Sequence, residues 1–132
     1  MSAEIQCRLY SGKGKRVMTS QTLREARKYE EASEKLIKAE ERPGFHLTPR
    51  TGWMNDPNGF SYYKGRYHLF YQYYPYESRW GSMHWGHAVS QDLLHWESLP
   101  CALAPDEAYD RDGCFSGSAV ELPDGRQLLM YT

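Results

Sequence analysis

Hydrophobic positions recur every three or four residues in one stretch near the N-terminus, which is the spacing of one face of an α-helix. Thr22 and Glu25 have the spacing of a capping box that starts such a helix, and Pro43-Gly44 ends it. The pattern predicts an amphipathic helix that packs on the residues after it, with its charged side chains in solvent. Its apolar stripe consists of Leu23, Ala26, Tyr29, Ala32 and Leu36.

The first 20 residues are polar and predict a flexible tail. Their one notable run, Gly12-Lys-Gly-Lys15, lacks the Gly-x4-Gly-Lys-Ser/Thr spacing of a phosphate-binding loop. Tail and helix together form the first part of the chain, residues 1–44.

The remainder of the chain, residues 45–132, changes to short segments typical of β-strands. Segments 59–63 and 66–73 are separated by Lys64-Gly65, which predicts a hairpin with glycine at its turn. Two further strands are expected at 83–90 and near 95–99. These four segments predict an antiparallel meander.

A second set of strands follows a loop rich in Pro, Asp and Gly. Strands are expected at 116–122 and 127–132, joined by a turn at Pro123-Asp-Gly125. The last strand is expected to leave an unpaired hydrophobic edge. Four strands in about 40–45 residues is the spacing of a propeller blade. The fold class expected is therefore all-β, with about one to two blades of a β-propeller preceded by an N-terminal α-helix.

Composition narrows the functional classes. The chain has 16 Lys+Arg and 17 Asp+Glu, whereas a nucleic-acid-binding domain usually has a basic excess. The chain contains no run of 18 apolar residues, which is the length that would predict a membrane span. Its N-terminus lacks the apolar core of a secretory signal. Cys7, Cys101 and Cys114 form an odd set without metal-type spacing. We expect a soluble cytoplasmic protein without a cofactor, and the oligomeric state stays open.

The segment Trp53-Met-Asn-Asp56-Pro-Asn-Gly59 combines polar and aromatic residues most densely. By itself, Asp-Pro flanked by Asn and followed by Gly is typical of a turn. The chain also contains Gln72, Trp80 and the run Phe115-Ser-Gly-Ser118. Carboxylates, amides, hydroxyls and aromatic faces are groups that bind sugar rings, so these residues indicate a carbohydrate site.

A metal site is the alternative reading of His84-x-x-His87. On a strand these two side chains point to opposite faces, and no third ligand is evident. We therefore expect no metal site.

Five motifs follow one another within residues 46–132: Trp53-Met-Asn-Asp-Pro-Asn-Gly59, Phe70-Tyr-Gln-Tyr73, His84-Trp-Gly-His87, Ser90-x-Asp-Leu-x-His-Trp96 and Gly113-Cys-Phe-Ser-Gly-Ser118. In this order they resemble glycoside hydrolase family 32, the family of invertases and sucrose-6-phosphate hydrolases. The helix before residue 46 resembles the N-terminal extension of bacterial cytoplasmic sucrose-6-phosphate hydrolases.

The resemblance implies a five-bladed propeller followed by a β-sandwich, of which residues 45–132 are an incomplete first part. It also implies hydrolysis of terminal β-D-fructofuranosides, such as sucrose or sucrose 6-phosphate, with retention of configuration. Asp56 corresponds to the nucleophile. The residues that would contact the sugar are Trp53, Met54, Asn55, Gln72, Trp80, Phe115 and Ser116.

A retaining glycosidase needs two carboxyl groups about 5–5.5 Å apart. In this family the acid/base lies in a Glu-Cys motif and a third carboxylate in an Arg-Asp-Pro motif, and neither motif occurs in residues 1–132. Arg111-Asp112 is followed by Gly113. We expect a truncated chain that carries the nucleophile half of the site. Two hypotheses stay open: a β-fructofuranosidase seen in part, or a catalytically silent product that binds sugar weakly.

Overall fold

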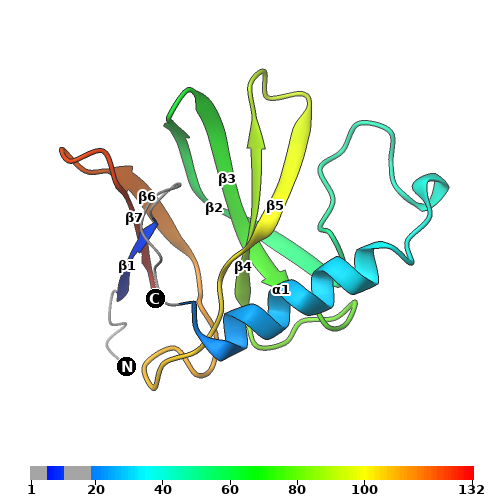
Figure 1. The fold of residues 1–132 in the computed structure, drawn as a ribbon, viewed down its shortest axis with the longest axis horizontal. Helices are drawn as coiled ribbons and strands as arrows, with labels where there is room; N and C mark the ends of the chain where they lie inside the picture. The colour runs from blue at the N-terminus through cyan, green and yellow to red at the C-terminus, as the bar shows by residue number, and fades with distance from the viewer. Residues whose placement is uncertain (1–5, 11–18) are drawn as a thin grey trace.

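The computed structural model of this protein describes residues 6–10 and 19–132, which form one α-helix, one short 3-10 helix and two antiparallel sheets (Figure 1). The four-stranded sheet has the order β2-β3-β4-β5, and the three-stranded sheet has the order β1-β7-β6. The helices are α1 (Gln21–Glu34) and η1 (Ala39–Glu41). The strands are β1 (Gln6–Tyr10), β2 (Trp53–Tyr63), β3 (Arg66–Tyr74), β4 (His84–Ser90), β5 (Trp96–Leu103), β6 (Gly117–Glu121) and β7 (Gln127–Tyr131).

The predicted meander is confirmed, because each strand of the first sheet pairs with the next along the chain. The hairpin between β2 and β3 turns at Lys64 (φ 49°) and Gly65 (φ 79°). Positive φ at both central residues is typical of the two-residue turn that matches the twist of a hairpin. The predicted hairpin of β6 and β7 is also confirmed.

The segment that reads as a turn in the sequence is part of a strand. β2 begins at Trp53, and its pairing with β3 shifts register between Met54 and Pro57 and again between Asn58 and Ser61. Gly59 lies in the second shift with φ +52°, where a Cβ atom would approach the Phe70 ring to 2.9 Å. Such bulges redirect side chains and are common beside active sites.

The helix begins earlier and ends earlier than its sequence pattern predicts. The N-cap is Ser20, whose Oγ accepts a hydrogen bond from the Leu23 N–H at 3.1 Å. The last turn tightens because Leu36 N–H donates to Ser33 O. Leu36 is 82% exposed, so it does not belong to the apolar stripe. No helix among the described residues is long and apolar enough to cross a membrane.

The charges of α1 do not all face solvent, since Glu30 is 1% exposed. Its Oε1 accepts hydrogen bonds from Cys101 N–H at 2.9 Å and from Arg50 Nη1 at 3.1 Å. Arg27 Nε donates to Cys101 O at 2.8 Å. Burial raises the pKa of Glu30, while the bond from Cys101 and the charge of Arg50 oppose this shift. Two helix side chains thus bind the backbone at the outer edge of β5, where a strand would otherwise pair.

Residues 6–10 form β1, although the sequence predicts a tail without regular structure there. β1 pairs with β7 from Gln6–Tyr131 to Tyr10–Gln127. β7 therefore has a neighbouring strand on both sides, and the expectation of an unpaired edge at this strand is wrong. The run Gly12 to Lys15 lies outside the described residues.

The two faces of the first sheet pack against different partners, because side chains alternate along each strand. Tyr71 and Tyr73 face α1, with Leu23 and Ala26 of the helix packed on them. Phe70 faces the second sheet. The buried residues of this second cluster are Phe70, Trp85, Ala102, Leu103, Cys114, Leu129 and Tyr131.

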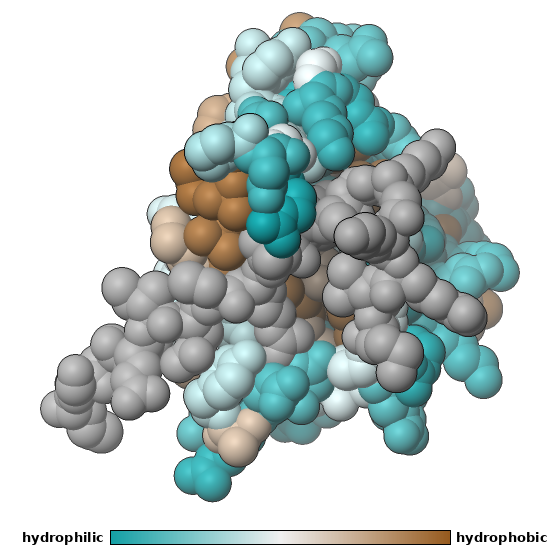
Figure 2. Space-filling view, turned by 60° about the vertical axis from the view of Figure 1, so that its left-hand side comes forward, coloured by the Kyte–Doolittle hydropathy of each residue, from teal (hydrophilic) through white to brown (hydrophobic). Residues whose placement is uncertain are grey.

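The outer face of the second sheet is partly apolar. Val120 is 43% exposed, and Leu128 and Met130 are half-buried on the same face. Figure 2, which turns this side of the molecule forward, shows hydrophobic residues gathered among hydrophilic ones.

We predict that Glu30→Ala lowers the free energy of unfolding by about 3 kcal/mol, because it leaves the Cys101 N–H without its buried acceptor and removes one of the two carboxylates paired with Arg50. The matched control is Glu31→Ala. Glu31 pairs with Lys35 at 3.6 Å on the solvent face, so its loss costs less than about 1 kcal/mol. Urea unfolding measures both values, and equal losses would contradict the role given to Glu30.

Candidate active site

Asp56 lies in the first irregular segment of β2 with its side chain exposed. Within the described part of the chain, its carboxylate has no hydrogen-bond or ion-pair partner. Its neighbours are tied to each other, since Trp53 Nε1 donates to Asn55 Oδ1 at 2.8 Å. The strand therefore presents a carboxylate to solvent beside a fixed indole–amide pair.

Residues 114–117, which we call the docking segment, enter β6 from the loop after β5. Three side chains of the first sheet bind its backbone. Asn58 Oδ1 accepts from Gly117 N–H at 3.3 Å, Gln72 Nε2 donates to Cys114 O at 3.0 Å, and Trp85 Nε1 donates to Phe115 O at 2.9 Å. The docking segment is thereby held against β2, β3 and β4.

The docking segment leaves two of the predicted site residues accessible. Phe115 is 36% exposed and Ser116 is exposed, although the backbone on either side is bound to the first sheet. Gly117 follows Ser116 and is bound to Asn58, which lies two residues after Asp56. The fold thus brings the start of β6 to the strand that carries Asp56.

Other predicted site residues have more structural roles. Gln72 is 3% exposed, and its amide nitrogen is used by Cys114 O. Met54 is half-buried against the core under α1. Both side chains therefore contribute to packing whatever else they contact.

Trp80 lies in the loop between β3 and β4 and is 58% exposed. The next residue, Gly81, packs so closely on the Tyr74 ring that a Cβ atom would lie 2.6 Å from it. Tyr74 pairs with Trp53 across the strands. Trp80 therefore stands at the Trp53 end of the sheet, and within the described residues no hydrogen bond joins it to Asp56.

Two residues that matter at this site receive no role from the sequence pattern. Asn58 belongs there to a turn and to the first family motif, and Trp85 belongs to the third motif. Their bonds to the docking segment join residues 59 and 30 positions apart. The one available signal was a buried-strand pattern around Trp85, since a buried indole needs a partner for its N–H.

The two histidines considered for a metal site are buried in different surroundings. His84 Nδ1 lies 2.8 Å from Ser82 O, and its ring contacts Tyr76. His87 Nε2 lies 3.0 Å from His68 Nδ1. Burial, with a smaller contribution from His68, lowers the pKa of His87 to about 3. Among the described residues, no group of three or more His, Cys, Asp and Glu side chains is placed to hold a metal ion.

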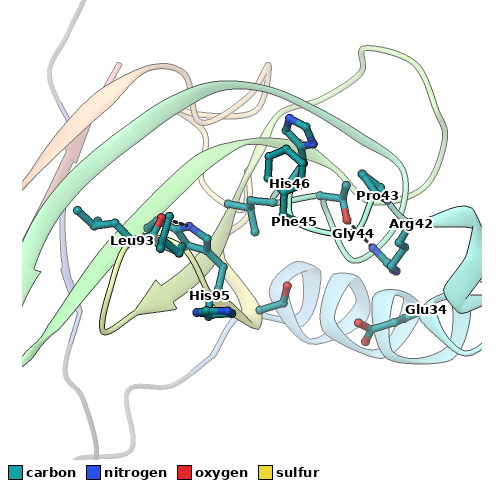
Figure 3. A pocket seen from close by; sticks show the side chains of 13 residues that line it. Glu34, Arg42, Pro43, Gly44, Phe45, His46, Leu93 and His95 are labelled. Carbon is teal, nitrogen blue, oxygen red and sulfur yellow. Dashed lines mark hydrogen bonds between the residues drawn. The ribbon is translucent and has the colours of Figure 1, made fainter.

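A hollow of about 730 Å³, separate from the predicted sugar-contacting residues, lies between the 42–48 loop and the turn that joins β4 to β5 (Figure 3). Phe45 and Leu93 contribute apolar side chains to it, and His46 and His95 contribute imidazoles. None of the predicted sugar-contacting residues lines this hollow. The candidate site is instead the open surface around Asp56.

Comparison with known proteins shows which family this chain resembles. The model of the "Glycosyl hydrolases family 32 N-terminal domain" matches residues 46–132. A sucrose-6-phosphate hydrolase of Zymomonas mobilis is 62% identical over 101 residues, which are 76% of this chain and 20% of that protein. A raffinose invertase of Escherichia coli is 60% identical over 90 residues, 68% of this chain and 19% of that protein.

Solved structures agree as well. The Bombyx mori β-fructofuranosidase BmSUC1 is 53% identical, with a TM-score of 0.68 over 76% of this chain and 21% of that chain. A variant of the same enzyme in complex with sucrose is 41% identical, with a TM-score of 0.66 over 83% of this chain and 27% of that chain.

The two sheets are thus part of a β-propeller, as the sequence predicts. The helix α1 precedes strands β2 to β7, while β1 lies before the helix. The chain belongs to glycoside hydrolase family 32. It spans about a fifth of the length of the curated relatives it matches.

We predict that Trp85→Phe weakens the docking of residues 114–117, because the partly buried Phe115 carbonyl loses its donor at a cost of about 1 kcal/mol. The control is Trp96→Phe, since Trp96 Nε1 donates to Leu93 O at 3.2 Å in an exposed turn. Urea unfolding and amide hydrogen exchange measure the effect. Faster exchange at Gly117 is expected in Trp85→Phe alone, and unchanged exchange there would refute the assignment.

Proposed function

We propose that this chain supplies the nucleophile part of a β-fructofuranosidase that hydrolyses sucrose or sucrose 6-phosphate with retention. The observation that carries the proposal is the exposed Asp56 carboxylate on the bulged segment of β2. The docking segment is bonded to this strand just before β6, and it exposes Phe115 and Ser116. Family membership supports the reaction class. The relatives' names support the substrate class.

In this proposal Asp56 attacks the anomeric carbon of the fructosyl unit and forms a covalent intermediate that water then hydrolyses. A retaining enzyme also needs a general acid/base carboxyl about 5–5.5 Å from the nucleophile. Asp56 is suited to attack because no internal partner within the described residues occupies its carboxylate. Its position on the strand, rather than on a free loop, favours a fixed direction of approach.

Asn55 and the aromatic residues provide the sugar contacts. Asn55 Oδ1 accepts from Trp53, so its amide nitrogen is the donor available to a ring hydroxyl. Phe115 and Trp80 expose rings that can cover the apolar side of a sugar. A small carbohydrate is therefore the proposed partner.

The relatives' names include both sucrose 6-phosphate and raffinose as substrate terms. We propose sucrose or its 6-phosphate as the substrate and, because Cys101 is a buried thiol outside any disulfide, a location in the reducing cytoplasm.

The second candidate function is that of a sugar-binding chain without catalysis. It is favoured by one observation: the Glu-Cys and Arg-Asp-Pro motifs, which would carry the other two carboxyl groups, do not occur in residues 1–132.

We predict that the 132-residue chain alone hydrolyses no sucrose above a blank, because one carboxylate cannot serve as nucleophile and general acid together. Joined to the rest of the Zymomonas mobilis relative at the matching position, the same residues should give an active enzyme. Release of glucose or glucose 6-phosphate measures both.

In the joined protein, Asp56→Asn is expected to lower kcat at least about 10³-fold, as loss of a covalent nucleophile does in other enzymes. The control is Asp124→Asn, which changes an exposed aspartate in the β6–β7 turn that pairs with Arg126. Activity that survives Asp56→Asn would rule out the nucleophile. Activity of the chain alone would rule out the need for a second carboxyl.

A further inference from the structure

Asn58 is a buried side chain that the proposed reaction leaves without a role. It is 3% exposed, and its Oδ1 accepts the Gly117 N–H at 3.3 Å. Because a backbone N–H can only donate, this bond fixes which end of the amide is the oxygen. Its Nδ2 has no hydrogen-bond partner among the described residues. The Gly117 bond is therefore the polar contact that defines the side chain's place.

The surroundings of this bond leave no freedom for a different spacing. A Cβ atom on Gly59 would lie 2.9 Å from the Phe70 ring and 3.1 Å from Ala119 Cβ, so β2 approaches β6 closely. A Cβ atom on Gly117 would lie 1.9 Å from Met130 O. The backbone of β2 is thus packed closely against Phe70 of β3, and the start of β6 is packed closely against Met130 of β7. The short planar amide of Asn58 connects β2 to the start of β6.

Asn58 and Gly117 each stand next to a group of the candidate site. Asn58 follows Asp56 after one proline, which restricts the backbone between them. Gly117 directly follows Ser116. The bond between Asn58 and Gly117 therefore fixes the strand that carries the Asp56 carboxylate relative to the segment that carries the Ser116 hydroxyl.

We propose that Asn58 is a positioning residue that sets the separation between the Asp56 carboxylate and Ser116. Its value for catalysis rests on the proposed function, whereas its effect on the geometry does not. Asn58 acts through the two backbones and does not itself touch substrate.

The test uses amide resonances of the isotope-labelled chain. Asn58→Leu removes the acceptor at similar size, and Asn58→Asp keeps an oxygen that can accept from Gly117. The control is Tyr63→Phe, which removes a bond of 2.8 Å from Tyr63 Oη to Gly125 O at another point of contact between the sheets. Asn58→Leu should shift the resonances of Asp56 and Ser116 and speed Gly117 exchange at least tenfold.

In Asn58→Asp and in Tyr63→Phe, the resonances of Asp56 and Ser116 and the exchange rate of Gly117 should stay close to those of the unmodified chain. Equal changes in Asn58→Leu and Tyr63→Phe would overturn the proposal, because they would show only a general loosening. If either Asn58 variant does not fold, the coupling across the hydrogen bond between Gly117 nitrogen and Asn58 Cγ decides. Its detection in the unmodified chain supports the proposal and its absence overturns it.

A separate arm keeps this inference distinct from the proposed function. In the joined protein, Asn58→Leu should lower kcat at least tenfold, while Tyr63→Phe leaves kcat unchanged. An inactive joined protein would count against the proposed function only, since the resonances report the geometry independently.

Discussion

The structure depends on the bonds that side chains of the first sheet make to the backbone of the docking segment. Backbone groups of a buried junction need hydrogen-bond partners, and residues 114–117 enter β6 from a loop rather than from a neighbouring strand. Asn58, Gln72 and Trp85 supply three of those partners from three successive strands, and the carbonyls of Met83 and Thr132 accept from the N–H groups of Cys114 and Phe115. The two sheets are thereby fixed to each other at the place where the candidate site lies.

This junction explains why the site can be open and still ordered. Asp56 and Ser116 are exposed, yet Asn58, two residues after Asp56, is bonded to Gly117, which directly follows Ser116. The same logic operates on the opposite face, where Glu30 and Arg27 of α1 bind the backbone of Cys101 at the outer edge of β5. The first sheet is thus held on both sides, and its irregular strand β2 can carry two register shifts.

Much of the fold was predictable because it is encoded locally. Alternating side chains and the Lys64-Gly65 turn predict the β2–β3 hairpin, and the order of the meander follows from short connections. The failures arise where distant contacts override local preference. Residues 53–59 have turn composition but pair with β3, and Glu30 is buried because Arg50 and Cys101 stand opposite it. The pairing of β1 with β7 joins opposite ends of the chain, which no local pattern reports.

The candidate site was predictable as a set of residue types but not as an arrangement. Asp56, Phe115 and Ser116 were found from motifs, while the bond that joins their strands links positions 59 residues apart. The most direct test is a crystal structure of the chain grown with fructose. Fructose is expected between Asp56 and Ser116, with Asn55 donating to a ring hydroxyl. Fructose in the hollow beside Phe45 and Leu93, with the Asp56 surface empty, would contradict it.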